Sequence, residues 1–287
     1  MLPHLQTKFV IYISMFFILI FSVLSDHAYG KDQYRGTGIA DLLENMTREQ
    51  VRKKAFERAM NNALAKAGIE VTSVDGLSRM EREEGEMFEN FIQFTFTRTN
   101  GLITEIDTLI DEIQSVDIPG GKPILQHRVE INAKILIEKE EADPEFQINM
   151  AVNEDIFREG DPVHIQLNST KDCYVTIFNL YSNDSLLIIF PNSEMEDNFI
   201  GENDTLRIPP KDAFWDLPAG LLPGHDTSVE ALVAIATKKR IPIQLEGIAM
   251  RNGLISQNDA LLTINRWRGK IGISDRTEAW CFYRIIK

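Results

Sequence analysis

Between residues 146 and 287, short apolar segments of strand length are separated by turn residues and prolines. Residues 163–167 alternate apolar and polar side chains, and residues 173–180 and 185–190 flank a short polar turn like the arms of a hairpin. Such patterns are typical of antiparallel strands with at least one buried face. Residues 229–236 form a further apolar strand. We therefore expect a mainly β, sandwich-like domain over residues 146–287, with one or two helices.

One of those helices is expected near the end of the chain. Asn258 is placed to cap it, because asparagine side chains accept hydrogen bonds from the free amides of a first helical turn. The helix would bury four apolar residues, Leu261, Leu262, Ile264 and Trp267. A terminal strand is expected after it.

A different pattern opens the first half. Thr47 and Gln50 have the spacing of a capping box, which starts a helix. Alanines then recur every four residues, at Ala55, Ala59 and Ala63. An alanine stripe on one face of an amphipathic helix indicates close approach to a sheet.

Strands are expected to follow this helix. Residues 91–97, 102–116 and 129–137 read as strands, the last with clear alternation. We expect a small α+β domain over residues 31–140, with one long helix on a three-stranded antiparallel sheet. The acidic segment 141–145 ends the pattern, carries Pro144 and is interpreted as a solvated linker.

The first 30 residues differ in composition from the rest. Lys8 precedes an apolar run from Phe9 to Leu24, and small residues stand at Ala28 and Gly30. This arrangement is typical of a secretory signal peptide, so the mature chain is expected to begin at Lys31 and to be periplasmic or secreted. An uncleaved signal segment acting as a membrane anchor is the alternative, although the run is short for a span.

The net charge of −13 over 287 residues argues against non-specific binding to nucleic acid or to anionic lipid. The two cysteines, Cys173 and Cys281, both lie in strand-like sequence. A disulfide between them and two buried free thiols are both open at this stage.

No catalytic or metal-binding pattern stands out. His127 and His164 are expected to face outward from strands, and the chain has no HExxH, Cys-x-x-Cys or Gly-x-Ser-x-Gly motif. We predict no catalytic residues, no metal and no cofactor. A hydrolase using acidic residues of the loop after Phe190 is the least favoured alternative.

Residues of two loops are candidates for binding. Phe214 and Trp215 lie in a proline-rich loop, where two aromatic side chains are less needed for a core. Asn192, Glu194 and Asp197 belong to the acidic loop that follows Phe190-Pro191, where contact is more plausible than catalysis.

Several segments of the second half carry a resemblance to a bacterial family, the domain of unknown function 4384. They are residues 160–163, 173–179, 189–192, 198–200, 208–209 and 230–236. The resemblance covers about residues 146–287, and Cys173 departs from the small residue usual there. It implies a secreted or envelope protein and assigns no catalytic residue.

The first domain is similar to the N-terminal domain of flagellar assembly protein T and of related envelope lipoproteins. The similarity rests on residues 36–38, the alanine helix, residues 68–71 and the strand 129–137. It implies a role in assembly. The sequence thus predicts an exported, non-enzymatic envelope protein that binds a protein partner or an assembly, with polysaccharide or peptidoglycan binding as the alternative.

Overall fold

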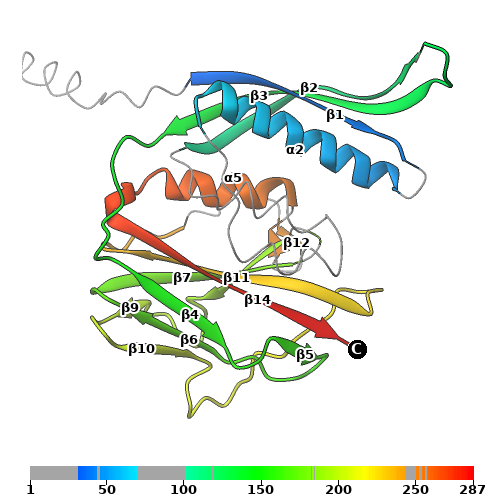
Figure 1. Cartoon of the computed structure of the whole chain (residues 1–287). Coiled ribbons are helices and arrows are strands. Elements are labelled where there is room, and N and C mark those ends of the chain that lie inside the picture. Colours follow the sequence, from blue (N-terminus) through cyan, green and yellow to red (C-terminus); the bar gives the residue numbers. More distant parts are fainter. Residues whose placement is uncertain are drawn as a thin grey trace, which may run out of the picture. The chain divides into compact units, whose positions relative to one another are not determined.

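The computed structural model describes residues 32–43, 46–69, 101–117, 119–181, 183, 185–243, 250–251, 254–255 and 257–287. The expected signal peptide and the expected strand 91–97 lie outside these residues. From Asp32 to Lys287 the chain forms one compact unit. The described part is mostly β, and its helices are α2 and α5, with a short 3-10 turn, η1 (Figure 1).

The N-terminal elements are a three-stranded antiparallel sheet, sheet A, and a helix packed on one of its faces (Figure 1). The strand order is β1-β3-β2, so the first strand lies at one edge. This edge strand was not expected from the sequence. The elements are β1 (Asp32–Asp41), α2 (Arg48–Lys66), β2 (Gly101–Val116) and β3 (Ile124–Ile137).

Helix α2 begins as the sequence predicts. The Thr47 side chain accepts from the Gln50 amide at 3.2 Å, and the Gln50 side chain accepts from the Thr47 amide at 2.7 Å. Ala55, Ala59 and Ala63 are fully buried against the sheet. Both the capping box and the small-residue contact with a sheet are confirmed.

Glycines of β1 make this close contact between helix and sheet feasible. A Cβ atom on Gly38 would lie 1.9 Å from the carbonyl oxygen of Ala55, and one on Gly36 would lie 2.0 Å from that of Ala59. Only glycine fits at these two positions, because the facing atoms are helix backbone and cannot move aside without shifting α2.

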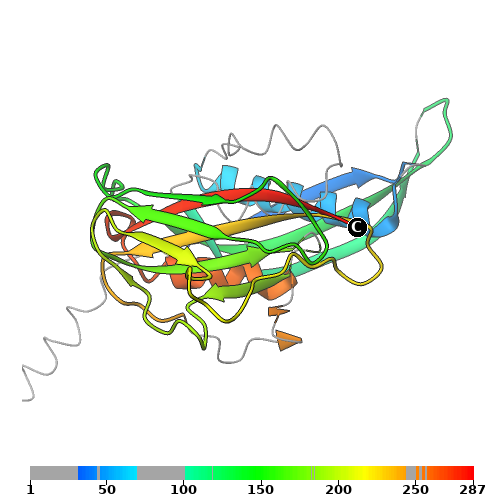
Figure 2. The same ribbon diagram turned by 90° about the horizontal axis from the view of Figure 1, so that it is seen from below.

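The C-terminal elements form two further sheets. Sheet B has the order β10-β6-β4, and sheet C has the order β12-β13-β8-β7-β11-β14-β5, with β9 also paired to β7. Figure 2 shows the strands around β11 and β14 running side by side in front of α5. The strands of sheet B are β4 (Ile148–Val152), β6 (Ile165–Ser169) and β10 (Thr205–Ile208). Those of sheet C are β5 (Ile156–Arg158), β7 (Cys173–Leu180), β8 (Leu186–Phe190), β9 (Phe199–Ile200), β11 (Thr227–Thr237), β12 (Met250–Arg251), β13 (Leu254–Ile255) and β14 (Arg276–Ile286), with α5 (Gln257–Arg268) and η1 (Ile273–Asp275) between the last two.

Strand β11 is the centre of sheet C and is buried on both faces. Val233 and Ile235 point into a first cluster of apolar side chains, which also includes Ile264 and Trp267 of α5. Residues on the opposite face of β11 point into a second cluster, shared with sheet B. This double burial explains why residues 229–236 are a continuous apolar run.

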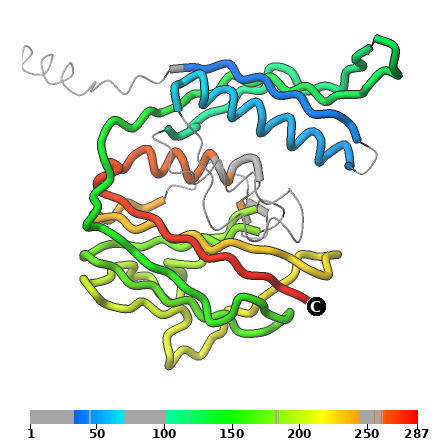
Figure 3. The backbone as a smooth tube through the Cα atoms, in the orientation of Figure 1, coloured from blue at the N-terminus to red at the C-terminus, as the bar shows by residue number. Residues whose placement is uncertain are grey.

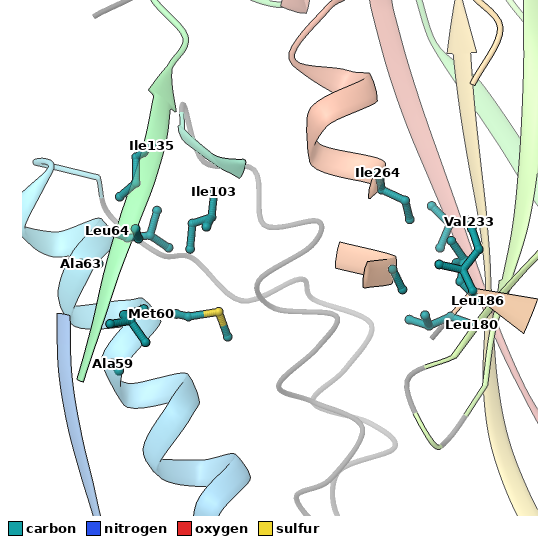
Figure 4. Packing of buried hydrophobic residues seen from close by; sticks show 14 of the residues in the cluster. Ala59, Met60, Ala63, Leu64, Ile103, Ile135, Leu180, Leu186, Val233 and Ile264 are labelled. Carbon is teal, nitrogen blue, oxygen red and sulfur yellow. The ribbon is translucent and has the colours of Figure 1, made fainter. Parts of the chain in front are cut away.

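The first cluster takes members from both halves of the chain. Side chains of α2, β2 and β3 point toward one another, and Ile264 gathers with side chains of sheet C (Figure 4). Helix α5 joins the halves through polar contacts: Asn265 Nδ2 donates to the Ile103 carbonyl at 3.1 Å, and Arg266 Nε donates to that of Thr104 at 2.8 Å. Asn258 lies inside this helix rather than before it, because the helix already begins at Gln257.

An acidic connection runs from the end of β3 to the start of β4 (Figure 3). Its side-chain contacts show that it is more than a solvated linker. Glu138 is buried and lies 2.6 Å from the guanidinium of Arg276, whose side chain is only 3% exposed. Further along, Asp143 accepts from Lys238 at 2.7 Å and from Lys171 at 2.9 Å, and these two ammonium groups lower its pKa. The domain boundary at residues 141–145 stays a prediction.

Two histidines were expected to face outward. His164 is exposed, as expected. His127 is buried, so that expectation was wrong. Its position in β3 belongs to the face that α2 covers, and its Nε2 lies 2.6 Å from Asp111.

We predict that Gly38→Ala lowers the free energy of unfolding by about 3 kcal/mol, because the new methyl group overlaps the Ala55 carbonyl. The measurement is the midpoint of urea unfolding. Gly220→Ala is the matched control, since a Cβ there meets nothing within 4 Å. Equal midpoints for the two variants would contradict the close packing of α2 on β1.

We also predict that Glu138→Gln lowers the free energy of unfolding by about 3 kcal/mol, because it removes the closest counter-charge of the buried Arg276 and leaves only Glu278, at 3.8 Å. The control is Lys287→Gln, which removes an exposed pair with Asp226 and should change stability by less than about 1 kcal/mol. Urea unfolding distinguishes the two. A Glu138→Gln effect as small as that of the control would rule out an important role for this pair.

Candidate binding pocket

A pocket of about 340 Å³ opens beside sheet B, between its strands and the loop that follows β10. We call it the Trp215 pocket. Its apolar lining includes Trp215, Pro209 and Ala213. Its polar lining includes His164, Gln166, Arg207, Lys211 and Asp216.

The alternation of the two strands explains which side chains line the pocket. In β6, Ile165 and Leu167 are buried in the second cluster, so Gln166 is exposed on the opposite face. In β10, Ile208 is buried in the same way and Arg207 is exposed. Arg207 is paired with Gln166 in the strand register, so the two side chains are cross-strand neighbours.

Trp215 and Phe214 lie differently although they are adjacent. Trp215 is partly buried, packs against the second cluster and lines the pocket. Phe214 is fully exposed and is not part of the lining. A fully exposed phenylalanine next to a pocket is the kind of side chain found at contact surfaces.

The charged groups of the pocket make no ion pairs among the described residues. Arg207 and Lys211 supply positive charge, and Asp216 is the acidic residue of the lining. Asn153 also lines the pocket, but its side chain is already engaged: it accepts from the His164 amide at 2.7 Å and donates to the Pro162 carbonyl at 3.2 Å.

The other predicted binding residues lie in the loop after β8, and none of them lines the Trp215 pocket. Asn192 shapes this loop, because its Nδ2 donates to the Ile189 carbonyl and its Oδ1 accepts from the amides of Glu194 and Met195. Asp197 accepts from the Phe199 amide at 3.2 Å. The side chains of Glu194 and Asp197 are exposed.

The two cysteines are free thiols, so the disulfide considered above is not formed. Cys281 of β14 and Asn179 of β7 lie at the same level of sheet C, on either side of β11. Cys173 lies six residues before Asn179 in β7. At about 3.3 Å per residue the offset is roughly 20 Å, far beyond the reach of a disulfide. Burial raises the pKa of both thiols.

A buried carboxyl group lies away from the pocket, on the face of sheet C that meets the second cluster. Asn179 Nδ2 and the Tyr283 hydroxyl both donate to Oε2 of Glu230, at 2.6 and 2.8 Å. Glu230 is 1% exposed, and burial raises its pKa to about 7 despite these two donors. Because it is so little exposed, the Glu230 carboxyl group makes its contacts inside the fold and is not placed to meet a substrate.

In the part of the chain that the structure describes, no three His, Cys, Asp or Glu side chains come together as a metal-binding group. Within the same residues, no helix is both long enough and apolar enough to span a membrane.

The sequence predicts Trp215 as a binding residue but gives no such indication for Arg207, Lys211 or Gln166. Arg207 lies at an exposed position of a four-residue strand, and its pattern looks like that of any solvated strand residue. The one available signal is the proline pair Pro209-Pro210, which places an irregular loop directly after the strand.

We predict that the free energy of unfolding falls as the pH rises from about 4.5 to about 8. Protonated Glu230 is favoured in the folded state, because its folded pKa of about 7 lies above the ordinary value of 4.5. The stabilisation is therefore complete below pH 4.5 and is lost as the pH passes through 7, with a total on the order of 3 kcal/mol. Glu230→Gln should remove this part of the pH dependence and be more stable than the wild type at pH 8. Parallel pH profiles of urea unfolding for the two proteins would contradict the assignment.

A comparison with curated proteins gave no match. Residues 156–240 match a family described as Domain of unknown function (DUF4384). This segment runs from β5 through β11 and contains the hairpin β7–β8, strand β10 and the Trp215 pocket apart from Asn153. The similarity of the first domain to flagellar assembly protein T stays a prediction. The second half of this chain therefore carries a DUF4384 domain, located at residues 156–240.

Proposed function

We propose that the chain is an exported, non-enzymatic protein of the cell envelope that acts by binding another protein or an assembly. The observation that carries this proposal is the exposed Phe214 beside the Trp215 pocket. An aromatic pair with one exposed and one half-buried member offers apolar area to a partner at little conformational cost. The apolar run and small residues of the first 30 positions support export.

The proposal assigns the C-terminal half the role of a rigid support. We infer a sandwich-like arrangement in which sheet B faces sheet C over the second cluster, which has members from both sheets. In that arrangement Arg207 and Gln166 lie on the outer face of sheet B. Sites on strands that pack on a core keep their geometry better than sites on loops.

Binding of a polysaccharide or of peptidoglycan is the second candidate. It is favoured by the combination of an indole ring with amide and carboxylate side chains, here Trp215 with Gln166 and Asp216. Aromatic rings pack against the apolar faces of sugar rings, and planar polar groups bind hydroxyls. A carboxylate-based hydrolase has less support, because Glu194 and Asp197 lie in an exposed loop outside the pocket.

We predict that Phe214→Ala and Trp215→Ala each weaken capture of a protein partner from envelope extracts at least tenfold, since truncation of a central aromatic contact commonly costs that much. The bait is the full exported chain, and captured proteins are quantified by mass spectrometry. Phe199→Ala is the matched control, because Phe199 is also exposed, at 47%, and lies outside the pocket.

Sedimentation with purified cell wall separates the two candidates. Loss of sedimentation on Trp215→Ala, with no protein captured by the wild type, would favour the saccharide. Protein capture that survives both substitutions would contradict a role for this loop.

A further inference from the structure

On the basis of the function proposed above, we propose that the Trp215 pocket binds a carboxylate of an extended peptide segment of the partner, together with a neighbouring apolar side chain. The pocket combines an apolar wall with positive charge that no described residue pairs, and it lies at the end of an edge strand. The positive charge would bind the carboxylate, the apolar wall would contact the apolar side chain, and the edge strand would pair with the peptide backbone.

Charge is the first feature. The chain as a whole is acidic, with a net charge of −13. The lining of the pocket has the opposite balance, because it includes two cationic residues, Arg207 and Lys211, and one acidic residue, Asp216. His164 is a further nitrogen donor or acceptor. A local excess of positive charge on an acidic protein favours an anionic ligand at that place.

The availability of these cations is the second feature. Elsewhere in the described structure, the amines of Lys171 and Lys238 are held by Asp143. Arg207 and Lys211, in contrast, make no ion pair or side-chain hydrogen bond among the described residues. The planar guanidinium of arginine is suited to bind a carboxylate through two parallel hydrogen bonds.

The apolar wall is the third feature. Trp215 is anchored on the second cluster and, with Pro209 and Ala213, forms a surface next to the cations. No described residue accepts a hydrogen bond from the indole Nε1–H of Trp215. The wall can therefore take an aliphatic or aromatic side chain and still offer one donor.

Strand geometry favours a peptide over an acidic sugar. Strand β10 lies at the edge of sheet B, and among the described residues no other strand pairs with its outer side. An extended peptide can add to such an edge and place alternate side chains toward the pocket. A sugar would use amides, but the Asn153 side chain is already engaged by the backbone of Pro162 and His164, which leaves Gln166 as the amide of the lining.

The test uses the full exported chain and a fluorescein-labelled octapeptide that ends in Asp-Phe with a free C-terminal carboxylate. Fluorescence anisotropy should show saturable binding that weakens with added salt. Arg207→Gln combined with Lys211→Gln should weaken binding at least tenfold, because both variants lose charge-assisted hydrogen bonds. Arg240→Gln, an exposed cation outside the pocket, is the matched control and should leave affinity unchanged.

Two altered peptides identify the source of the carboxylate. Loss of binding on C-terminal amidation assigns it to the chain end, and loss on replacing Asp by Asn assigns it to the side chain. Equal binding of the peptide that carries both changes would overturn the proposal. So would binding that the Arg207 and Lys211 substitutions leave intact, or binding of an oligoglucuronate alone.

The peptide-binding and partner-capture experiments together distinguish an error in the proposed ligand from an error in the proposed function. If partner capture still depends on Trp215 while no carboxylate peptide binds, the protein-binding role stands and the ligand chemistry is wrong. If neither depends on Trp215, both are wrong.

Discussion

A buried ion pair between Glu138 and Arg276 joins the end of β3 to the start of β14, and the two halves of the fold are arranged around it. Two charges this deeply buried are stable only when each satisfies the other, so the pair fixes where the chain must turn after the first domain. Arg276 also donates to the Ile271 carbonyl at 2.6 Å, which positions the turn after α5. Helix α5 then holds the start of β2 through hydrogen bonds that Asn265 and Arg266 donate to its backbone carbonyls. The halves are thereby connected by specific polar contacts as well as by apolar packing.

The two sheets of the C-terminal half differ in how open they are to a ligand. Sheet C is covered by α5 on one face and by the second cluster on the other, so every residue of β11 after Thr227 is buried. In sheet B, by contrast, only one face is buried. The exposed face carries Arg207 and Gln166, and the loop after β10 brings Trp215 next to them. The binding role that we propose rests on this difference between the sheets rather than on any single motif.

Much of the fold could be predicted, because most elements carry a strong local signal. The capping box at Thr47 and the alternation in β3 and β6 each report a local preference, and the structure has the helix and strands there. Strand β1 was missed because Gly36 and Gly38 interrupt its apolar pattern, and their purpose appears only when α2 packs against them. Of the residues that line the candidate site, the sequence predicts only Trp215 as a binding residue. Gln166 and Arg207 are neighbours only through the register of β6 with β10, which no local pattern encodes.

The central claim is that the loop beside the Trp215 pocket is a contact surface for another protein. The most direct measurement is photo-crosslinking in living cells, with p-benzoylphenylalanine in place of Phe214, compared with the same replacement of Phe199. Both positions are exposed, but only the first adjoins the pocket. We predict a discrete crosslinked protein from position 214 that is absent from position 199 and is lost when Trp215 is changed to alanine. No crosslink from position 214, or the same crosslinks from both positions, would contradict the account.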